Sequence, residues 1–345
     1  MFDWGKSYNA VWRVFKVNES TWADAEQVGG IDSISITRSC SGDAPMLESG
    51  TMTLTGDFES GYYRIVMNAT QDVTTERVDV ATLLCESRKS TRNYGVSQPN
   101  VSCNSVLYPA YTQVMLDGAY IAAGADVAQF VAELLRNCIK APVEVEGGFT
   151  ISSFYWFDFG IRILEAAWEA LNIGGYVIQI DGRGVVHIRP RPSTVALDLD
   201  GANASLLGTS VLSEFDTSDV PNRYIAKSDE TVAIAVNDNP ESPVSTVSRG
   251  YIYDEVDESP ATVNDETLPM YARRKLEELS TNIAETRSYT REYWPDVYPF
   301  DLVKASPATV GIIGNLRVVN QSLTCSQGIT ISEQAAREVN LWQAT

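Results

Sequence analysis

The sequence predicts a mainly β protein with an α+β insertion, in which two antiparallel β halves flank a unit of two helices and a hairpin. Short runs of alternating apolar and polar residues, separated by Gly, Asp and Ser turns, fill residues 10–87 and return from about residue 211. Such closely spaced strands are typical of an antiparallel barrel or sandwich that buries one face. Between the halves, residues 126–190 carry helical periodicity followed by a hairpin pattern. A chain of 345 residues is long enough for two or three domains.

The N-terminal half is predicted to consist mostly of strands. Apolar or alternating runs predict them at residues 11–17, 34–37, 51–55, 62–67 and 77–84. Residues 88–105 are polar and interrupted by turn-forming residues, so we expect a loop or crossover there. A mixed run over residues 106–121 leads into the middle unit.

Two amphipathic helices are predicted in the middle unit. Asp126 is placed to cap the first, with Gln129 three residues later as in a capping box. The apolar face of this helix consists of Val127, Phe130, Val131, Leu134, Leu135 and Cys138. For the second helix, Asp158 is a candidate cap and Gly174-Gly175 a glycine stop. Its apolar face consists of Ile161, Leu164, Ala167, Trp168 and Leu171.

A β-hairpin is predicted after the helices. Residues 176–180 alternate up to the loop Asp181-Gly182-Arg183-Gly184, and residues 186–188 alternate away from it. Glycines in a short loop between two such runs are a strong hairpin signal. We expect both helices to bury their apolar faces on this hairpin, which leaves little room for a cleft.

His187 is the only histidine and lies between two apolar residues of this hairpin, Val186 and Ile188. Strand alternation therefore directs it to the opposite face. Metal sites usually need several His or Cys ligands, and a catalytic nucleophile needs its base close by. We interpret His187 as an ordinary strand residue.

The second β half is predicted to follow a linker at residues 191–210. A third helix is expected near residues 268–279, with Thr267 as a candidate cap and Pro269 in its first turn. Strands are expected at residues 222–227, 231–236, 251–253, 288–292, 300–303, 316–319 and 323–331, the last with a turn at Gly328.

Composition excludes several classes of function. The chain carries 26 basic and 45 acidic residues, a formal net charge of −19 that disfavours gripping nucleic acid or an anionic membrane. Five scattered cysteines without a CxxC pair indicate reduced thiols better than a disulfide framework. The N-terminus lacks the pattern of a signal peptide, and no apolar run reaches the length of a membrane span, so no membrane anchor is expected.

No motif assigns a catalytic, cofactor-binding or metal-binding residue, and we do not expect an enzyme. There is no P-loop, dinucleotide-binding glycine motif, nucleophile elbow or basic stripe. Acidic clusters at residues 198–200, 254–258 and 265–266 are too frequent to identify a carboxylate pair, and only part of a calcium loop is present at 198–201. The aromatic run over residues 154–157 leaves carbohydrate binding open beside core packing or a subunit interface.

Several local patterns resemble baseplate hub proteins of tailed bacteriophages and related contractile injection machines. Those that resemble the first barrel of this family are Ile34–Arg38, Leu47–Leu54 and Tyr62–Ile65. Those similar to its α/β insertion are the middle helix, Gly174-Gly175 and the 181–182 hairpin that ends in Ile188-Arg189-Pro190. Those similar to its closing barrel are Pro221–Tyr224, the helix over residues 272–279, and Pro299–Val303.

The resemblance implies two tube-like antiparallel β-barrel domains, with boundaries at residues 1–105 for the first barrel, 106–200 for the α+β middle domain and 201–345 for the second. It also implies a homotrimer whose six barrels form a ring, which adapts a sixfold tail tube to a threefold tip in the baseplate of a virion tail assembled in the host cytoplasm. Implied partners are the tail tube or distal tail protein, the tip or spike protein and the tape measure protein. DNA would pass through the channel without specific binding, and the chain's acidity gives such a channel a wall that repels DNA. The alternative is a carbohydrate-binding module of a tail or surface protein.

Overall fold

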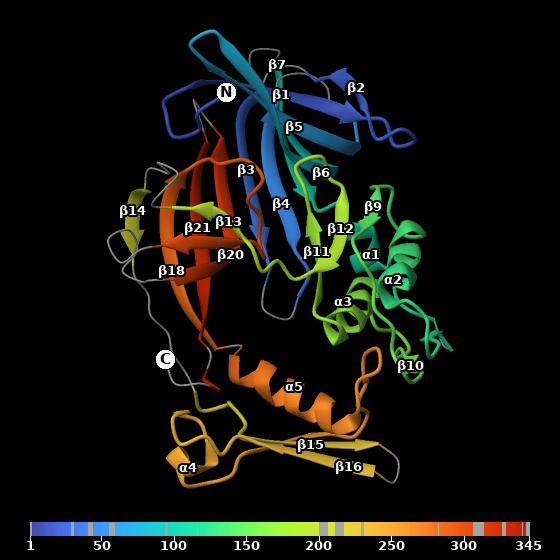
Figure 1. Cartoon of the computed structure of the whole chain (residues 1–345). Coiled ribbons are helices and arrows are strands. Elements are labelled where there is room, and N and C mark those ends of the chain that lie inside the picture. The colour runs from blue at the N-terminus through green and yellow to red at the C-terminus, as the bar shows by residue number, and fades with distance from the viewer. Residues whose placement is uncertain are drawn as a thin grey trace.

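The computed structural model describes residues 2–28, 31–40, 44–54, 59–93, 96–116, 118–199, 206–210, 217–228, 231–281, 283–305, 314–325, 329–339 and 341–342. Strands dominate these residues, and the few helices lie in the middle and lower parts of the molecule (Figure 1). The expectation of a mainly β protein is confirmed.

One large sheet contains strands from both ends of the chain. Its N-terminal strands are β1 (Asn9–Val17), β2 (Asp24–Gln27), β3 (Ile31–Ser39), β4 (Leu47–Leu54), β5 (Gly61–Gln71), β6 (Thr74–Asn93) and β7 (Val96–Asn104). Its later strands are β13 (Val195–Asp198), β14 (Leu206–Ser210), β18 (Ile283–Glu292), β19 (Leu302–Ala305), β20 (Gly314–Cys325) and β21 (Ile329–Val339).

The two halves of this sheet join where β3 pairs with β20. The order is β14-β18-β21-β20-β3-β4-β7-β6-β5-β1-β2, and β19 adds β13 beside β20. The joint is antiparallel, with Ile36 opposite Leu323. Among the described residues no pairing closes either half into a barrel, because the order ends at β2 and β14.

Residues 88–105 correct a prediction of the sequence. They were expected to form a loop, but β6 runs on to Asn93 and pairs along its length with β7, with Thr91 opposite Gln98. The error arises because an antiparallel ladder satisfies backbone groups whatever the side chains are, while the sequence signal reads only apolar alternation. For the same reason the predicted linker at 191–210 contains β13 and β14. The strand expected at 251–253 is wrong in the opposite sense: these apolar residues are not in a strand, and β17 begins at Asp254.

The middle unit contains the expected helices and hairpin. Its elements are α1 (Tyr108–Thr112), β8 (Tyr120–Ile121), α2 (Val127–Arg136), β9 (Val143–Val145), β10 (Tyr155–Trp156), α3 (Ile163–Ile173), β11 (Tyr176–Ile180) and β12 (Val186–Pro190). The Asp126 carboxylate accepts a hydrogen bond from the Gln129 backbone N–H at 3.2 Å, which confirms the predicted cap. Asp158 does not cap α3, because residue 162 is still extended and the helix begins at Ile163.

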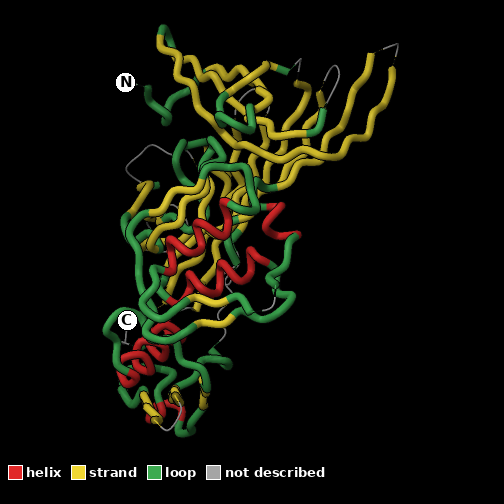
Figure 2. Tube along the Cα trace, turned by 90° about the vertical axis from the view of Figure 1, so that its right-hand side faces the viewer, coloured by secondary structure: helices red, strands yellow, loops and turns green. Residues whose placement is uncertain are grey.

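The helices of the middle unit lie against the large sheet rather than forming a separate body (Figure 2). One core contains side chains from all three parts of the chain, including Tyr62 and Leu84 from the first, Val131 from α2 and Phe300 from the last. Trp168 of α3 stacks on Phe300 with ring centroids 5.7 Å apart. The hairpin and its helices are therefore fixed to both halves of the large sheet.

A lower unit completes the fold (Figure 1). Its elements are β15 (Arg223–Ser228), β16 (Thr231–Val236), α4 (Thr246–Arg249), β17 (Asp254–Asp257) and α5 (Leu268–Thr281). The sheet order is β16-β15-β17, and α5 covers one face through a small core of Tyr224, Ala226, Ala233, Tyr271, Ala272 and Leu276. The predicted third helix is confirmed, and it runs two residues past the expected end.

The cysteines give a second correction. Cys85 and Cys103 lie opposite each other on β6 and β7 and are joined by a disulfide, whereas reduced thiols were expected throughout. Their spacing of 18 residues carries no pair motif, because the contact depends on the register of a hairpin that the sequence did not predict. Cys40, Cys138 and Cys325 are free.

Candidate functional site

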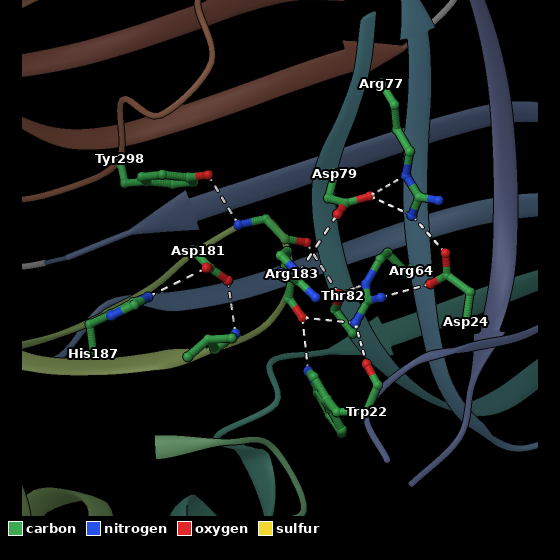
Figure 3. A network of polar contacts seen from close by, with 12 residues as sticks. Trp22, Asp24, Arg64, Arg77, Asp79, Thr82, Asp181, Arg183, His187 and Tyr298 are labelled. Atoms are coloured by element: carbon green, nitrogen blue, oxygen red, sulfur yellow. Dashed lines mark hydrogen bonds and ion pairs between the residues drawn. The ribbon is translucent and has the colours of Figure 1, made fainter. Parts of the chain in front are cut away.

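A network of polar contacts lies where the hairpin of the middle unit meets the large sheet (Figure 3). The hairpin turn is built locally: the Gly184 N–H donates to the Asp181 carbonyl at 2.9 Å, and the Val185 N–H donates to the Asp181 carboxylate at 2.8 Å. Gly184 has a φ of +74°, a conformation that glycine adopts without strain. The conformation of the turn thus requires the glycine at position 184.

Side chains from the first half of the chain donate hydrogen bonds to the backbone carbonyl oxygens of this turn. The Arg183 carbonyl accepts from the Trp22 indole N–H at 2.9 Å and from the Arg64 guanidinium at 3.2 Å. The Gly182 carbonyl accepts from the Thr82 hydroxyl at 3.2 Å. Arg64 is itself fixed by Asp24 at 2.7 Å, so strands β5 and β6 present a preformed set of donors.

The last part of the chain holds the other side of the turn. The Gly182 N–H donates to the Tyr298 hydroxyl at 3.0 Å. The Arg38 guanidinium lies 4.9 Å from the centre of the Tyr298 ring, a cation–π arrangement. Residues from all three parts of the chain therefore converge on one four-residue turn.

A buried ionic chain crosses the joint between β3 and β20. Arg38 donates to Glu48 at 2.8 Å, and its guanidinium lies 3.5 Å from the Gln321 amide oxygen. Gln321 donates to Glu333 at 2.8 Å, and Arg291 donates to Glu333 at 2.7 Å. All five side chains are buried. Because an unpaired charge at such depth is costly, the chain favours this one alignment of the two halves.

Burial sets the electrostatics of this chain. It raises the pKa of the Glu48 carboxyl, and the Arg38 guanidinium opposes that rise. The second carboxylate oxygen of Glu48 is buried and has no hydrogen-bond partner among the described residues. The joint thus holds two arginines and two glutamates out of water, and these charges serve the pairing of strands.

A cavity of about 280 Å³ lies at the hairpin of β11 and β12, on the face that carries Gln179, His187 and Arg189. It corrects the expectation of little room for a cleft, because the side chains of β11 and β12 that do not face the helices line it. Its residues are Glu146, Gln179, Ile180, Asp181, His187, Arg189, Pro192, Thr194, Ala196, Asp296, Tyr298 and Asp301.

His187 lies in this cavity between two carboxylates. It is partly exposed while its neighbours Val186 and Ile188 are buried, as strand alternation predicted. Its ring nitrogens lie 3.4 Å from Asp181 and 3.6 Å from Glu144. The hydrogen bond with Asp181 raises the pKa of His187 above its ordinary value. Within the described ranges, no group of three or more His, Cys, Asp or Glu side chains is placed to hold a metal ion.

The acidic clusters found in the sequence take part in structural contacts. Asp198 pairs with Lys304 at 3.2 Å, and Asp254 pairs with Arg223 at 2.5 Å. Asp257 accepts from the Tyr271 hydroxyl at 2.6 Å, and Glu266 pairs with Arg274 at 2.8 Å. The other Asp of the 198–200 cluster lies outside the described residues.

The aromatic run divides between core and surface. Phe157 is buried and Tyr155 half-buried, whereas Phe154 and Trp156 are exposed beside Tyr120. The Tyr120 ring centre lies 4.7 Å from that of Trp156 and 5.6 Å from that of Phe154. Core packing thus holds for Phe157, whereas Phe154 and Trp156 are exposed to solvent.

The residues of the polar network and of the buried ionic chain were not predicted as functional, because their partners are far apart in the sequence. Arg38 and Gln321, for example, are separated by 283 residues. Only the turn glycines gave a signal. In the described part of the chain, no helix combines the length and apolar character needed to cross a membrane.

The fold is shared with phage tail proteins. The structure is similar to a tail protein from Neisseria meningitidis MC58, with a TM-score of 0.62 and 13% identity over 98% of this chain and 99% of that one. A 43 kDa tail protein of prophage MuSo2 from Shewanella oneidensis gives a TM-score of 0.61 and 13% identity over 96% and 98%. The sequence matches no protein-family model and no curated protein.

A third similar structure comes from a secretion machine. The E. coli c3393 protein, described as a component of the type VI secretion system with structural similarity to the T4 tail proteins gp27 and gp5, gives a TM-score of 0.52 at 10% identity over 92% of this chain and 76% of that one. The resemblance to phage tail proteins is confirmed at the level of the fold.

Proposed function

We propose that this protein is a structural hub of a phage tail or phage-like particle, located in the baseplate. The observation that carries the proposal is the end-to-end similarity of its fold to tail proteins, which covers 98% of this chain and 99% of the Neisseria chain. A shared fold does not by itself fix a function, so the proposal also uses the character of the polar site.

The polar contacts around the hairpin turn and the buried ionic chain between β3 and β20 support a mechanical role. These ion pairs and hydrogen bonds join the first part of the chain, the middle unit and the last part to one another. Arg64, Trp22 and Tyr298 make such contacts with the hairpin turn. Contacts of this kind make three parts of a chain move as one rigid piece. Rigidity is what a ring between two other components of a tail requires.

In the proposed assembly, three chains form a ring with their β domains around a channel. Each half of the large sheet, left open by the described strand pairings, would complete one tube-like barrel in the ring. Six barrels would then face a sixfold tail tube while three chains face a threefold tip. The boundaries of these domains follow the sequence prediction at residues 1–105, 106–200 and 201–345. The net charge of −19 per chain lets DNA pass through the channel without adhering.

The proposed partners are other components of the tail. They are the tail tube or distal tail protein, the tape measure protein, and a tip or spike protein. The experiment is electron microscopy of the purified chain together with its mass in solution. A threefold ring with a central channel supports the hub, whereas a closed globular particle without a channel contradicts it.

A second candidate is carbohydrate binding, favoured by the exposed rings of Tyr120, Phe154 and Trp156. Aromatic rings with one solvent-exposed face are common in recognition surfaces. Binding of the chain to a glycan array, lost in Trp156→Ala, would support this candidate. We propose no enzymatic activity.

A further inference from the structure

In the part of the chain that the structure describes, nothing covers one face of the sheet of the lower unit. Tyr224, Ala226 and Ala233 point toward α5 and are buried, so the alternate residues point outward. The pairing places Ile225 opposite Ile234 and Val256, with Val232 and Val236 on the same side. We name these five residues the aliphatic face.

This composition is unusual for a surface in contact with water. An antiparallel sheet with one solvated side normally alternates apolar residues inward with polar residues outward. Here Val232, Ile234, Val236 and Val256 are 42–59% exposed. Side chains exposed to this degree make an apolar patch on the order of a few hundred Å², the size class that marks interaction sites.

A second uncovered apolar patch lies on the middle unit. Strands β8 and β10 pair Trp156 with Tyr120, which puts both rings on the side opposite buried Ile121. Phe154, Trp156 and Phe159 are 57–74% exposed. We name Tyr120, Phe154, Trp156 and Phe159 the aromatic tip.

The charges beside the two patches differ in sign. Asp158, Glu165 and Glu169 lie near the aromatic tip: Tyr155, between two tip residues, donates to Glu169 at 3.4 Å, and Glu165 precedes Glu169 by one helical turn. The pKa of Glu169 is raised by partial burial and by the charges of these two neighbours, so the region is negative.

The aliphatic face has the opposite tendency. Arg223 is neutralised by Asp254, and exposed Lys227 stands opposite Val232 in the pairing of β15 with β16. Glu255 and Asp257 of β17 pair with Tyr224 and Ala226 and so point to the α5 side. The outward side chains of the three strands therefore sum to one positive charge, that of Lys227, on strands that carry two basic and three acidic residues in all. Lys227 is thus opposite in sign to the carboxylates beside the aromatic tip, and among the described residues nothing covers either patch.

A threefold ring needs two different patches on each chain. A twofold contact uses the same patch twice, whereas a ring of three repeats a head-to-tail contact between two distinct surfaces. A standard interface covers roughly 800 Å² on each partner, with an apolar core and a charged rim. The aliphatic face and the aromatic tip each have the size and composition of such a core.

We propose that the aliphatic face of one protomer packs against the aromatic tip of the next copy of this chain around the ring. This inference rests on the proposed function, because it assumes the threefold assembly. Lys227 would meet the carboxylates beside the tip, and Ile234 would lie closest to the Trp156 ring.

The test is cross-linking between copies. Ile234→Cys and Trp156→Cys are made as separate chains in a Cys138→Ser background, because Cys138 is the half-exposed free thiol while Cys40 and Cys325 are buried. After mixing and mild oxidation, we expect a covalent dimer on a non-reducing gel. The control replaces Ile234→Cys with Val73→Cys, a fully exposed position at the β5–β6 turn outside both patches, and should give none.

A second variant tests the same contact without a new thiol. Ile234→Asp should lower the fraction of trimer at least tenfold while leaving the folded monomer intact, and Val73→Asp should not. A trimer that forms no such cross-link and is unaffected by Ile234→Asp overturns this inference and leaves the hub proposal standing. A covalent dimer from Ile234→Cys alone shows a twofold contact and also overturns it. A parent chain that stays monomeric overturns both.

Discussion

Gly182 lies directly against the backbone carbonyl of Asp79, with no space for a Cβ atom between them. This contact brings the turn of the middle unit onto strand β6 of the large sheet, and it explains why a glycine occupies a position whose φ is not positive. The turn can reach its donors on Thr82, Trp22 and Arg64 only because nothing projects from residue 182.

Replacing Gly182→Ala should therefore lower the free energy of unfolding by about 2–4 kcal/mol, because the backbone of β6 must move and the turn loses its hydrogen bonds. Urea unfolding followed by circular dichroism measures the change. Gly118→Ala is the matched control: a Cβ there meets nothing, but φ is +81°, so only backbone strain of about 1 kcal/mol is expected. Equal losses for the two variants would contradict the close contact.

The buried chain across the β3–β20 joint predicts a large effect of removing one charge. Glu333→Gln leaves Arg291 without its buried counter-ion and should cost about 3–5 kcal/mol of unfolding free energy. The exposed pair of Lys6 and Asp3 is the control, since Lys6→Met should cost less than about 1 kcal/mol. The same urea titrations compare the two. A small loss in Glu333→Gln would mean that the charges do not align the halves.

His187 predicts a pH dependence. Its hydrogen bond to Asp181 and the charges of Asp181 and Glu144 raise its pKa, while burial and Arg189 lower it. A raised folded pKa stabilises the fold fully below the unfolded value near 6.5, and this stabilisation is lost as pH rises through the folded value.

We therefore expect the fall in unfolding free energy as the pH rises above about 6.5 to be smaller in His187→Gln than in the parent. Since this is the only histidine, its ring proton signal in NMR reports the folded pKa directly. A pKa below 6.5 would contradict the geometry around Asp181 and Glu144.

The disulfide between Cys85 and Cys103 predicts three titratable thiols in the denatured, unreduced chain and five after reduction. It closes a loop of 18 residues, so its loss in Cys103→Ser should lower the free energy of unfolding by about 3 kcal/mol under oxidising conditions. Under reducing conditions the difference between parent and variant should shrink. Five thiols without reduction would restore the sequence expectation of free cysteines.

Much of the fold could be predicted where it depends on neighbours in the sequence. The Asp126 cap, the faces of α2 and α3, and the 181–184 turn all follow from local spacing. The start of α3 could not, because the extended conformation of Arg162 overrides the capping ability of Asp158. Likewise the β6–β7 hairpin pairs through its backbone and leaves no apolar alternation to detect.

The polar site depended on distant contacts and was therefore missed. Nothing in the sequence around Arg38 or Glu333 indicates that a buried chain connects them through Gln321, since this follows from the pairing of β3 with β20. Charged residues are ordinarily placed on the surface by sequence reasoning, and these are exceptions because they are paired.

The most direct test of the hub is the mass of the purified chain in solution, measured by light scattering over a range of concentrations. A hub should form a species of three chains, three times 37.9 kDa, that images as a ring with a central channel. A single 37.9 kDa species at every concentration would contradict it.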